Sequence, residues 1–84
     1  MDATVSYKLI TEHDIAKAIE AYADVYMISP ITASAYLTTD RKMYKRWLDG
    51  ESTITVNRAR IILTKIRNNW PVGIPMPEVL DCVA

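Results

Sequence analysis

Residue types that often mark a catalytic or metal-binding protein are scarce in this chain of 84 residues, which has one cysteine, one histidine and two glycines. The lone Cys82 cannot form an internal disulfide, and with His13 it makes no cluster at metal-ligand spacing. A glycine-rich loop that cradles phosphates is excluded, because Gly50 and Gly73 are the only glycines. The sequence therefore predicts a protein that is not an enzyme and that carries no metal or other cofactor.

Long apolar runs are also absent. No stretch approaches the roughly 20 apolar residues that a membrane-spanning helix needs, and the N-terminus has no apolar run behind a basic segment, as a signal peptide would. A chain of this length forms one domain at most. We therefore expect a small cytoplasmic protein that has no membrane partner.

The charge is unevenly distributed, although the net charge is zero. Residues 1–39 hold two basic residues against five acidic ones, a balance of −3, whereas residues 40–67 hold eight against three, a balance of +5. A basic region on a neutral protein is typical of a face that meets phosphate groups. The alternative is a solvated pair of helices whose cations only aid solubility.

Hydrophobic periodicity predicts an all-α fold, a small bundle of four to five helices with a central helix-turn-helix. A T-x-x-D capping box at Thr11 starts the first helix, which covers about residues 11–27. Ser29 and Pro30 are a favoured N-cap and first position for a short second helix ending near Leu37. The apolar positions of the first helix are Ile15, Ala18, Ile19, Tyr22 and Tyr26.

The third helix is predicted over residues 40–48, after a turn of two threonines, one of which caps it. Its apolar side holds Trp47, Met43 and Tyr44, and Gly50 ends it because glycine readily adopts positive φ. Either Thr53 or Thr55 can cap a fourth helix, which Pro71 stops. The apolar stripe of that helix is Val56, Ala59, Ile62, Leu63, Ile66 and Trp70.

These elements divide the chain into three parts. Residues 1–10 are an N-terminal arm, residues 11–70 are the helix-turn-helix domain, and residues 71–84 are an apolar tail with three of the four prolines. Apolar tails of this kind either fold back on their domain or contribute to a partner interface. The tail is thus a candidate for dimerisation or for binding another protein.

The run from Ser29 to Leu63 resembles the Cro/repressor-type (Xre-like) helix-turn-helix of phage and bacterial regulators. The closest part is YKRWLDGES followed by an apolar helix, with an aromatic residue near the end of the third helix, then a glycine, then a polar loop. The resemblance covers about half of the chain. It departs from the family at Ser34, where an alanine is common, and at Thr38, where a glycine is common. It implies a dimeric regulator that binds operator DNA.

If the resemblance holds, the first turns of the third helix enter the major groove. Arginine can pair bidentately with guanine, whereas Lys42 and Lys45 can instead contact phosphate, which positions the protein without reading sequence. Arg41 and Arg46 could alternatively pair with nearby carboxylates. The candidates for base or near-base contacts are Thr39, Arg41, Lys42 and Lys45, flanked by Arg46.

Two further pairs of residues are candidate phosphate ligands. Ser29 and Thr32 begin the second helix, where a helix N-terminus favours anions. Arg58 and Arg60 lie just inside the fourth helix.

The predicted function is sequence-specific DNA binding by a homodimer, as in a transcriptional repressor of phage or mobile-element type. One helix makes too few contacts for tight specific binding, so two-fold pairing is the usual solution. The alternative is a small protein-interaction module, such as a phage-encoded modulator of a host protein. In that case residues 72–84 and the tyrosines would supply the surface.

Overall fold

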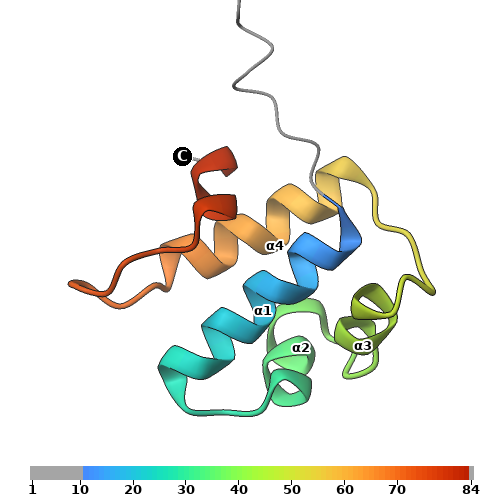
Figure 1. The fold of residues 1–84 in the computed structure, drawn as a ribbon, viewed down its shortest axis with the longest axis horizontal. Coiled ribbons are helices and arrows are strands. Elements are labelled where there is room, and N and C mark those ends of the chain that lie inside the picture. The colour runs from blue at the N-terminus through green and yellow to red at the C-terminus, as the bar shows by residue number, and fades with distance from the viewer. Residues whose placement is uncertain (1–10, 84) are drawn as a thin grey trace, which may run out of the picture.

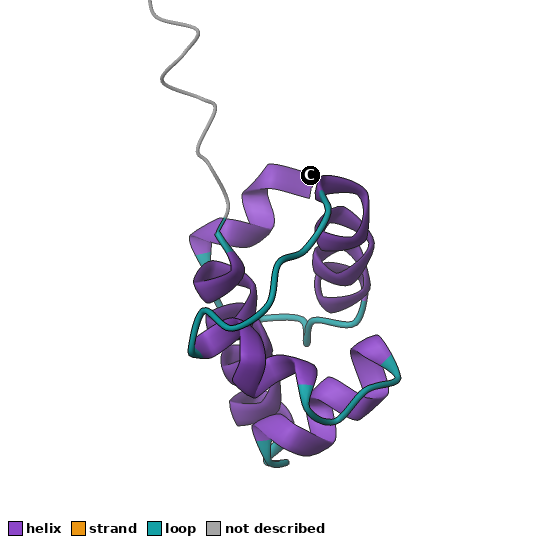
Figure 2. Ribbon diagram, turned by 90° about the vertical axis from the view of Figure 1, so that its right-hand side faces the viewer, coloured by secondary structure: helices purple, strands orange, loops and turns teal. Residues whose placement is uncertain are grey.

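The computed structural model describes the backbone of residues 11–83 and the side chains of residues 11–80. The predicted arm at residues 1–10 lies outside the described residues. The described part is helical and contains no strand (Figure 2), which confirms the predicted all-α class. Its elements are α1 (Glu12–Tyr26), α2 (Pro30–Thr38), α3 (Met43–Leu48), α4 (Val56–Asn68) and a 3-10 helix, η2 (Glu78–Val83).

Three of the helices begin at side-chain caps that the sequence predicts. Thr11 and Asp14 form a reciprocal capping box at α1. Ser29 Oγ accepts the amide of Thr32 at 3.1 Å, with Pro30 in the first position of α2. Of the two candidate caps for α4 the structure selects Thr55, whose hydroxyl accepts the amide of the residue three positions on. Each cap satisfies an amide that the helix itself leaves without a partner.

The helix α1 is the centre of the domain, because it packs against α2, α3, α4 and η2 (Figure 1). As predicted, Trp47 and Trp70 are buried in the core. Two predicted apolar positions are wrong. Val56 is 76% exposed, since the buried stripe of α4 begins one turn later, and Tyr26 is 44% exposed at the end of α1. The largest fully buried apolar side chains are Trp47, Ile15, Ile19, Ile62, Leu63, Ile66 and Leu80.

The end of the tail folds back on the domain. Leu80 in η2 is fully buried in the core, and Arg67 in α4 donates to its carbonyl oxygen at 3.3 Å. The indole N–H of Trp70 donates to the carbonyl of Ile74 at 2.9 Å, which ties the start of the tail to α4. Between these points the segment 72–76 remains at the surface. The tail was expected either to fold back on the domain or to contribute to a partner interface, and its η2 segment folds back.

Candidate nucleic-acid interface

The helix α3 is shorter than predicted, because it begins at Met43 rather than at residue 40. Thr39 does not cap it. It is instead the C-cap of α2, in the left-handed region at φ 63°, and its amide donates to Ala35 O. Asp40 then closes the turn, since its carboxylate accepts the amide of Lys42 at 2.8 Å. The predicted recognition helix 40–48 is therefore corrected to a four-residue turn, 39–42, followed by a six-residue helix.

A buried serine joins the two helices of this motif. Ser34 is fully buried in α2, and its hydroxyl donates to Asp40 O at 2.7 Å and accepts the amide of Tyr44 at 3.1 Å. Thr38, also buried, accepts the Asp40 amide at 3.1 Å, and its hydroxyl lies within hydrogen-bond distance of two carbonyl oxygens, Ser34 O at 2.7 Å and Asp40 O at 2.9 Å. In the sequence, the sign of the role of Ser34 is that serine stands at a position where Xre-like regulators commonly have alanine.

The far end of α3 is fixed by a glycine turn, as predicted. Gly50 has φ +75° and its amide donates to Trp47 O, while the amide of Glu51 donates to Arg46 O at 2.8 Å. These two bonds form the paired C-terminal arrangement known as a Schellman motif. In the loop that follows, the amide of Ile54 donates to the carboxylate of Glu12, which ties the loop to the first turn of α1.

The tyrosine of α3 holds the helix against α1. The hydroxyl of Tyr44 donates to the carboxylate of Glu20, which also receives the ammonium of Lys17 at 3.2 Å. Burial and this hydrogen bond raise the pKa of Tyr44 to about 12. The same bond lowers the pKa of Glu20 against the opposing effect of burial. The bond is therefore made between a neutral phenol and a charged carboxylate at neutral pH.

Four cations of the turn and α3 surround one open depression of about 460 Å³. All four are exposed, and none forms an ion pair or a hydrogen bond through its side chain within the described part of the chain. The alternative pairing of arginines with neighbouring carboxylates therefore does not form. Four cations against two carboxylates leave this surface with a positive charge. The lining residues are Arg41, Lys42, Lys45, Arg46, Ile31, Asp49 and Glu51.

The structure does not bring the other predicted contacts into this depression. Thr39 is exposed beside it but does not line it, and the hydroxyls of Ser29 and Thr32 bond each other at 2.9 Å. Arg58 donates to Thr38 O at 3.4 Å, so its guanidinium covers the C-terminal carbonyls of α2. Arg60 lies two residues on, about 200° around the helix from Arg58.

Lys65 is not among the candidate contacts predicted from the sequence, and the structure gives it a role. Its ammonium donates to Leu37 O at 3.5 Å, about two turns of α4 beyond Arg58, which also contacts α2. Cations at a helix C-terminus interact favourably with its partial negative charge. Two side chains of α4 therefore support the end of α2 at the point where the turn begins.

The described residues contain neither a candidate metal site nor a candidate membrane span. No group of three or more His, Cys, Asp or Glu side chains could hold a metal ion, and no helix has both the length and the apolar character needed to cross a membrane. Comparison of the chain with protein-family models, with curated proteins and with solved structures gave no match. The resemblance of Ser29–Leu63 to Xre-like regulators accordingly stays a prediction from the residues quoted for it.

Proposed function

We propose that this protein is a cytoplasmic, sequence-specific DNA-binding regulator that places the turn 39–42 and α3 in the major groove. The observation that carries the proposal is the depression around α3, because four exposed cations without partners among the described residues line it, two in the turn 39–42 and two on α3. A cation that has no partner in the protein is available to displace counterions from phosphate. We assign Arg41, Lys42, Lys45 and Arg46 to this contact and no catalytic step to the protein.

The positioning of α3 supports the same proposal. Its first turn is held by Ser34, its far end by Gly50, and its inner side by Tyr44 on Glu20. Base contacts require side chains on rigid elements, since small displacements remove a bidentate bond. Arg58 supports the turn rather than contacting phosphate, and Arg60 is left out of the proposed interface.

The test is a comparison of charge-reversal variants on duplex DNA. A Lys42→Glu/Lys45→Glu variant should keep its circular dichroism spectrum, because both side chains are exposed, and should lose DNA binding. The single variants Lys45→Glu and Arg60→Glu form a matched pair, since each exchanges an exposed helical cation for glutamate. Only Lys45→Glu should weaken binding. Equal affinity of the native protein and the folded double variant would refute the proposal.

Salt dependence separates DNA binding from an apolar contact. If the four cations each neutralise one phosphate, the logarithm of the binding constant should fall against the logarithm of salt concentration with a slope of about −3 to −4. Selection from a randomised duplex library should then enrich an inverted repeat with half-sites about one helical turn apart, if the regulator is a homodimer. A single enriched half-site would favour a monomer.

A second candidate function, a protein-interaction module, is favoured by a separate observation. Apolar side chains are exposed at the end of α1 and along α2, among them Met27 at 92% and Tyr36 at 73%. These two residues lie outside the cationic depression. A protein contact there could therefore accompany DNA binding.

A further inference from the structure

We propose that Ile31, in the first turn of α2, contacts the C5 methyl group of a thymine when the cationic depression meets DNA. Ile31 is 44% exposed and does not belong to the core. It lines the depression, whose other six lining residues are all charged. The inferred contact rests on the proposed function and adds to it the base that an uncharged side chain would read.

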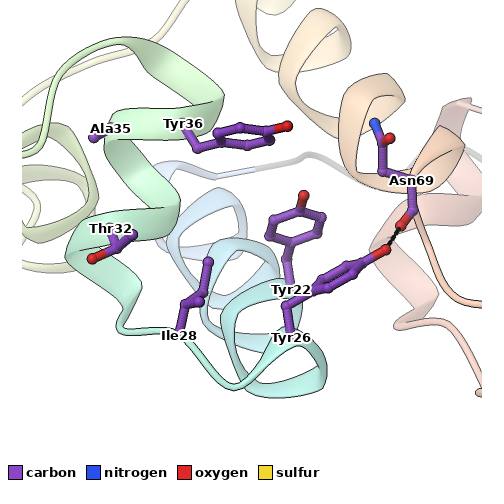
Figure 3. Close-up of a pocket in the computed structure, with 7 residues that line it drawn as sticks. All are labelled: Tyr22, Tyr26, Ile28, Thr32, Ala35, Tyr36 and Asn69. Carbon is purple, nitrogen blue, oxygen red and sulfur yellow. Dashed lines mark hydrogen bonds between the residues drawn. The ribbon is translucent and has the colours of Figure 1, made fainter.

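The exposed residues of α2 contribute to two different surfaces. Thr32, Ala35 and Tyr36 line a groove between α2, the end of α1 and the end of α4, and no residue that lines this groove is charged (Figure 3). Ile31 instead lines the depression that α2 forms with the turn 39–42 and α3. An apolar contact made by Ile31 is therefore made within a ring of cations, where a partner of negative charge is favoured.

The position of Ile31 relative to the cations is fixed by hydrogen bonds before and after it in the sequence. Ser29 caps α2 by accepting the amide of Thr32 at 3.1 Å. Three residues after Ile31, the hydroxyl of Ser34 joins α2 to the turn and to α3. An isoleucine in a helix also has one strongly preferred χ1 rotamer. Little conformational entropy is therefore lost when this side chain meets a partner.

Thymine presents the matching chemistry. Base pairs offer hydrogen-bond donors and acceptors in the major groove, and thymine adds an apolar group, its C5 methyl. The cations around Ile31 attract the phosphates that flank the groove, which brings base edges to the depression. Because isoleucine forms no hydrogen bond through its side chain, a purely polar base edge against it would lose water without gaining a partner. Contact with the methyl instead removes apolar surface of both partners from water.

Deoxyribose is the other apolar part of DNA that Ile31 could contact, but it is the same in every nucleotide. A contact with the sugar would add affinity without reading sequence, and it would not respond to the removal of a base methyl. The two contacts are therefore distinguished by duplexes in which deoxyuridine replaces thymidine, because uracil pairs with adenine as thymine does and lacks only the methyl.

Equilibrium binding to such duplexes tests the contact. In the site enriched from the randomised library, each thymine is replaced in turn by uracil. At one position of a half-site the native protein should bind about fourfold more weakly, the effect expected for one buried methyl group. Ile31→Ala should keep its circular dichroism spectrum and bind the two duplexes nearly equally. The matched control is Ile61→Ala, which shortens an isoleucine of α4 that is 57% exposed and outside the depression, and which should keep the native preference for thymine.

Two results would overturn the thymine contact and leave the proposed function intact. One is an enriched site in which no single uracil weakens binding, or which contains no thymine, since Ile31 would then face sugar or solvent. The other is an equal preference for thymine in the native and Ile31→Ala proteins, which would assign the methyl to another side chain. A native protein that binds no duplex DNA, or binds it without sequence preference, would refute the proposed function and the thymine contact with it.

Discussion

The substitution Ser34→Ala tests whether one hydroxyl holds the helix-turn-helix together. It removes the acceptor of the partly buried Tyr44 amide and leaves that amide without a partner, whereas Asp40 O, which loses the Ser34 hydroxyl, remains within hydrogen-bond distance of the hydroxyl of Thr38. An unsatisfied buried donor costs about 1–3 kcal/mol, and alanine in α2 regains up to about 0.5 kcal/mol of helix propensity. We expect a net loss of about 1–2 kcal/mol, which for a domain of this size lowers Tm by about 4–16 °C.

Urea unfolding followed by circular dichroism measures this loss, and amide exchange of Tyr44 locates it. The control is Thr64→Ala, which removes an exposed hydroxyl of α4 and should change stability by less than about 0.5 kcal/mol. A Ser34→Ala protein as stable as the native one, with unchanged exchange at Tyr44, would refute the reasoning. The turn would then form without the serine hydroxyl, as it does in Xre-like regulators that have alanine at this position.

Three further predictions have defined outcomes. Folding raises the pKa of Tyr44 from 10.0 to about 12, so the stability that this tyrosine contributes below pH 10 is lost as pH rises through 12. In urea titrations at a series of pH values, the free energy of unfolding of a Tyr44→Phe variant should therefore fall less steeply with alkaline pH than that of the native protein. An equally steep fall in the two proteins would contradict this prediction. Leu80→Ala should cost about 2–5 kcal/mol, because the side chain is fully buried, whereas Val72→Ala should cost nothing measurable by thermal melting. Thr39→Gly should raise stability by about 0.5–1 kcal/mol by relieving the left-handed backbone at φ 63°, and a lower Tm would show that the threonine is not strained.

Local rules were sufficient to predict the parts of this fold that depend on neighbouring residues. The capping box at Thr11, the Ser29-Pro30 start of α2 and the glycine stop at Gly50 each involve residues within a few positions of one another. The burial of Trp47 and Trp70 followed from helical spacing. The start of α3 did not, because α2 continues through Thr38 and so places the left-handed residue at Thr39.

The features that sequence reasoning missed depend on contacts across the fold. The hydroxyl of Ser34 has a structural role because the turn brings the amide of Tyr44, ten residues later in the sequence, within hydrogen-bond distance of it. Whether Arg58 meets phosphate or the end of α2 depends on how α4 crosses α2. A groove lined by Tyr22, Tyr36 and Asn69, among others, likewise combines residues of α1, α2 and the end of α4. Hydrophobic periodicity predicts which face of a helix a residue lies on, but not which residue of another element it contacts.

The brevity of α3 has an evolutionary consequence. A helix of six residues is far below the length at which helices persist alone in water, so the surface it presents exists only while the rest of the domain is folded around it. Under the proposed function, natural selection for DNA binding by that surface therefore acts on the whole core as well as on the four cations. In a mutational scan scored by function in cells, substitutions at Ile19 or Ile62, which contact no ligand, should be depleted as strongly as substitutions at Lys45.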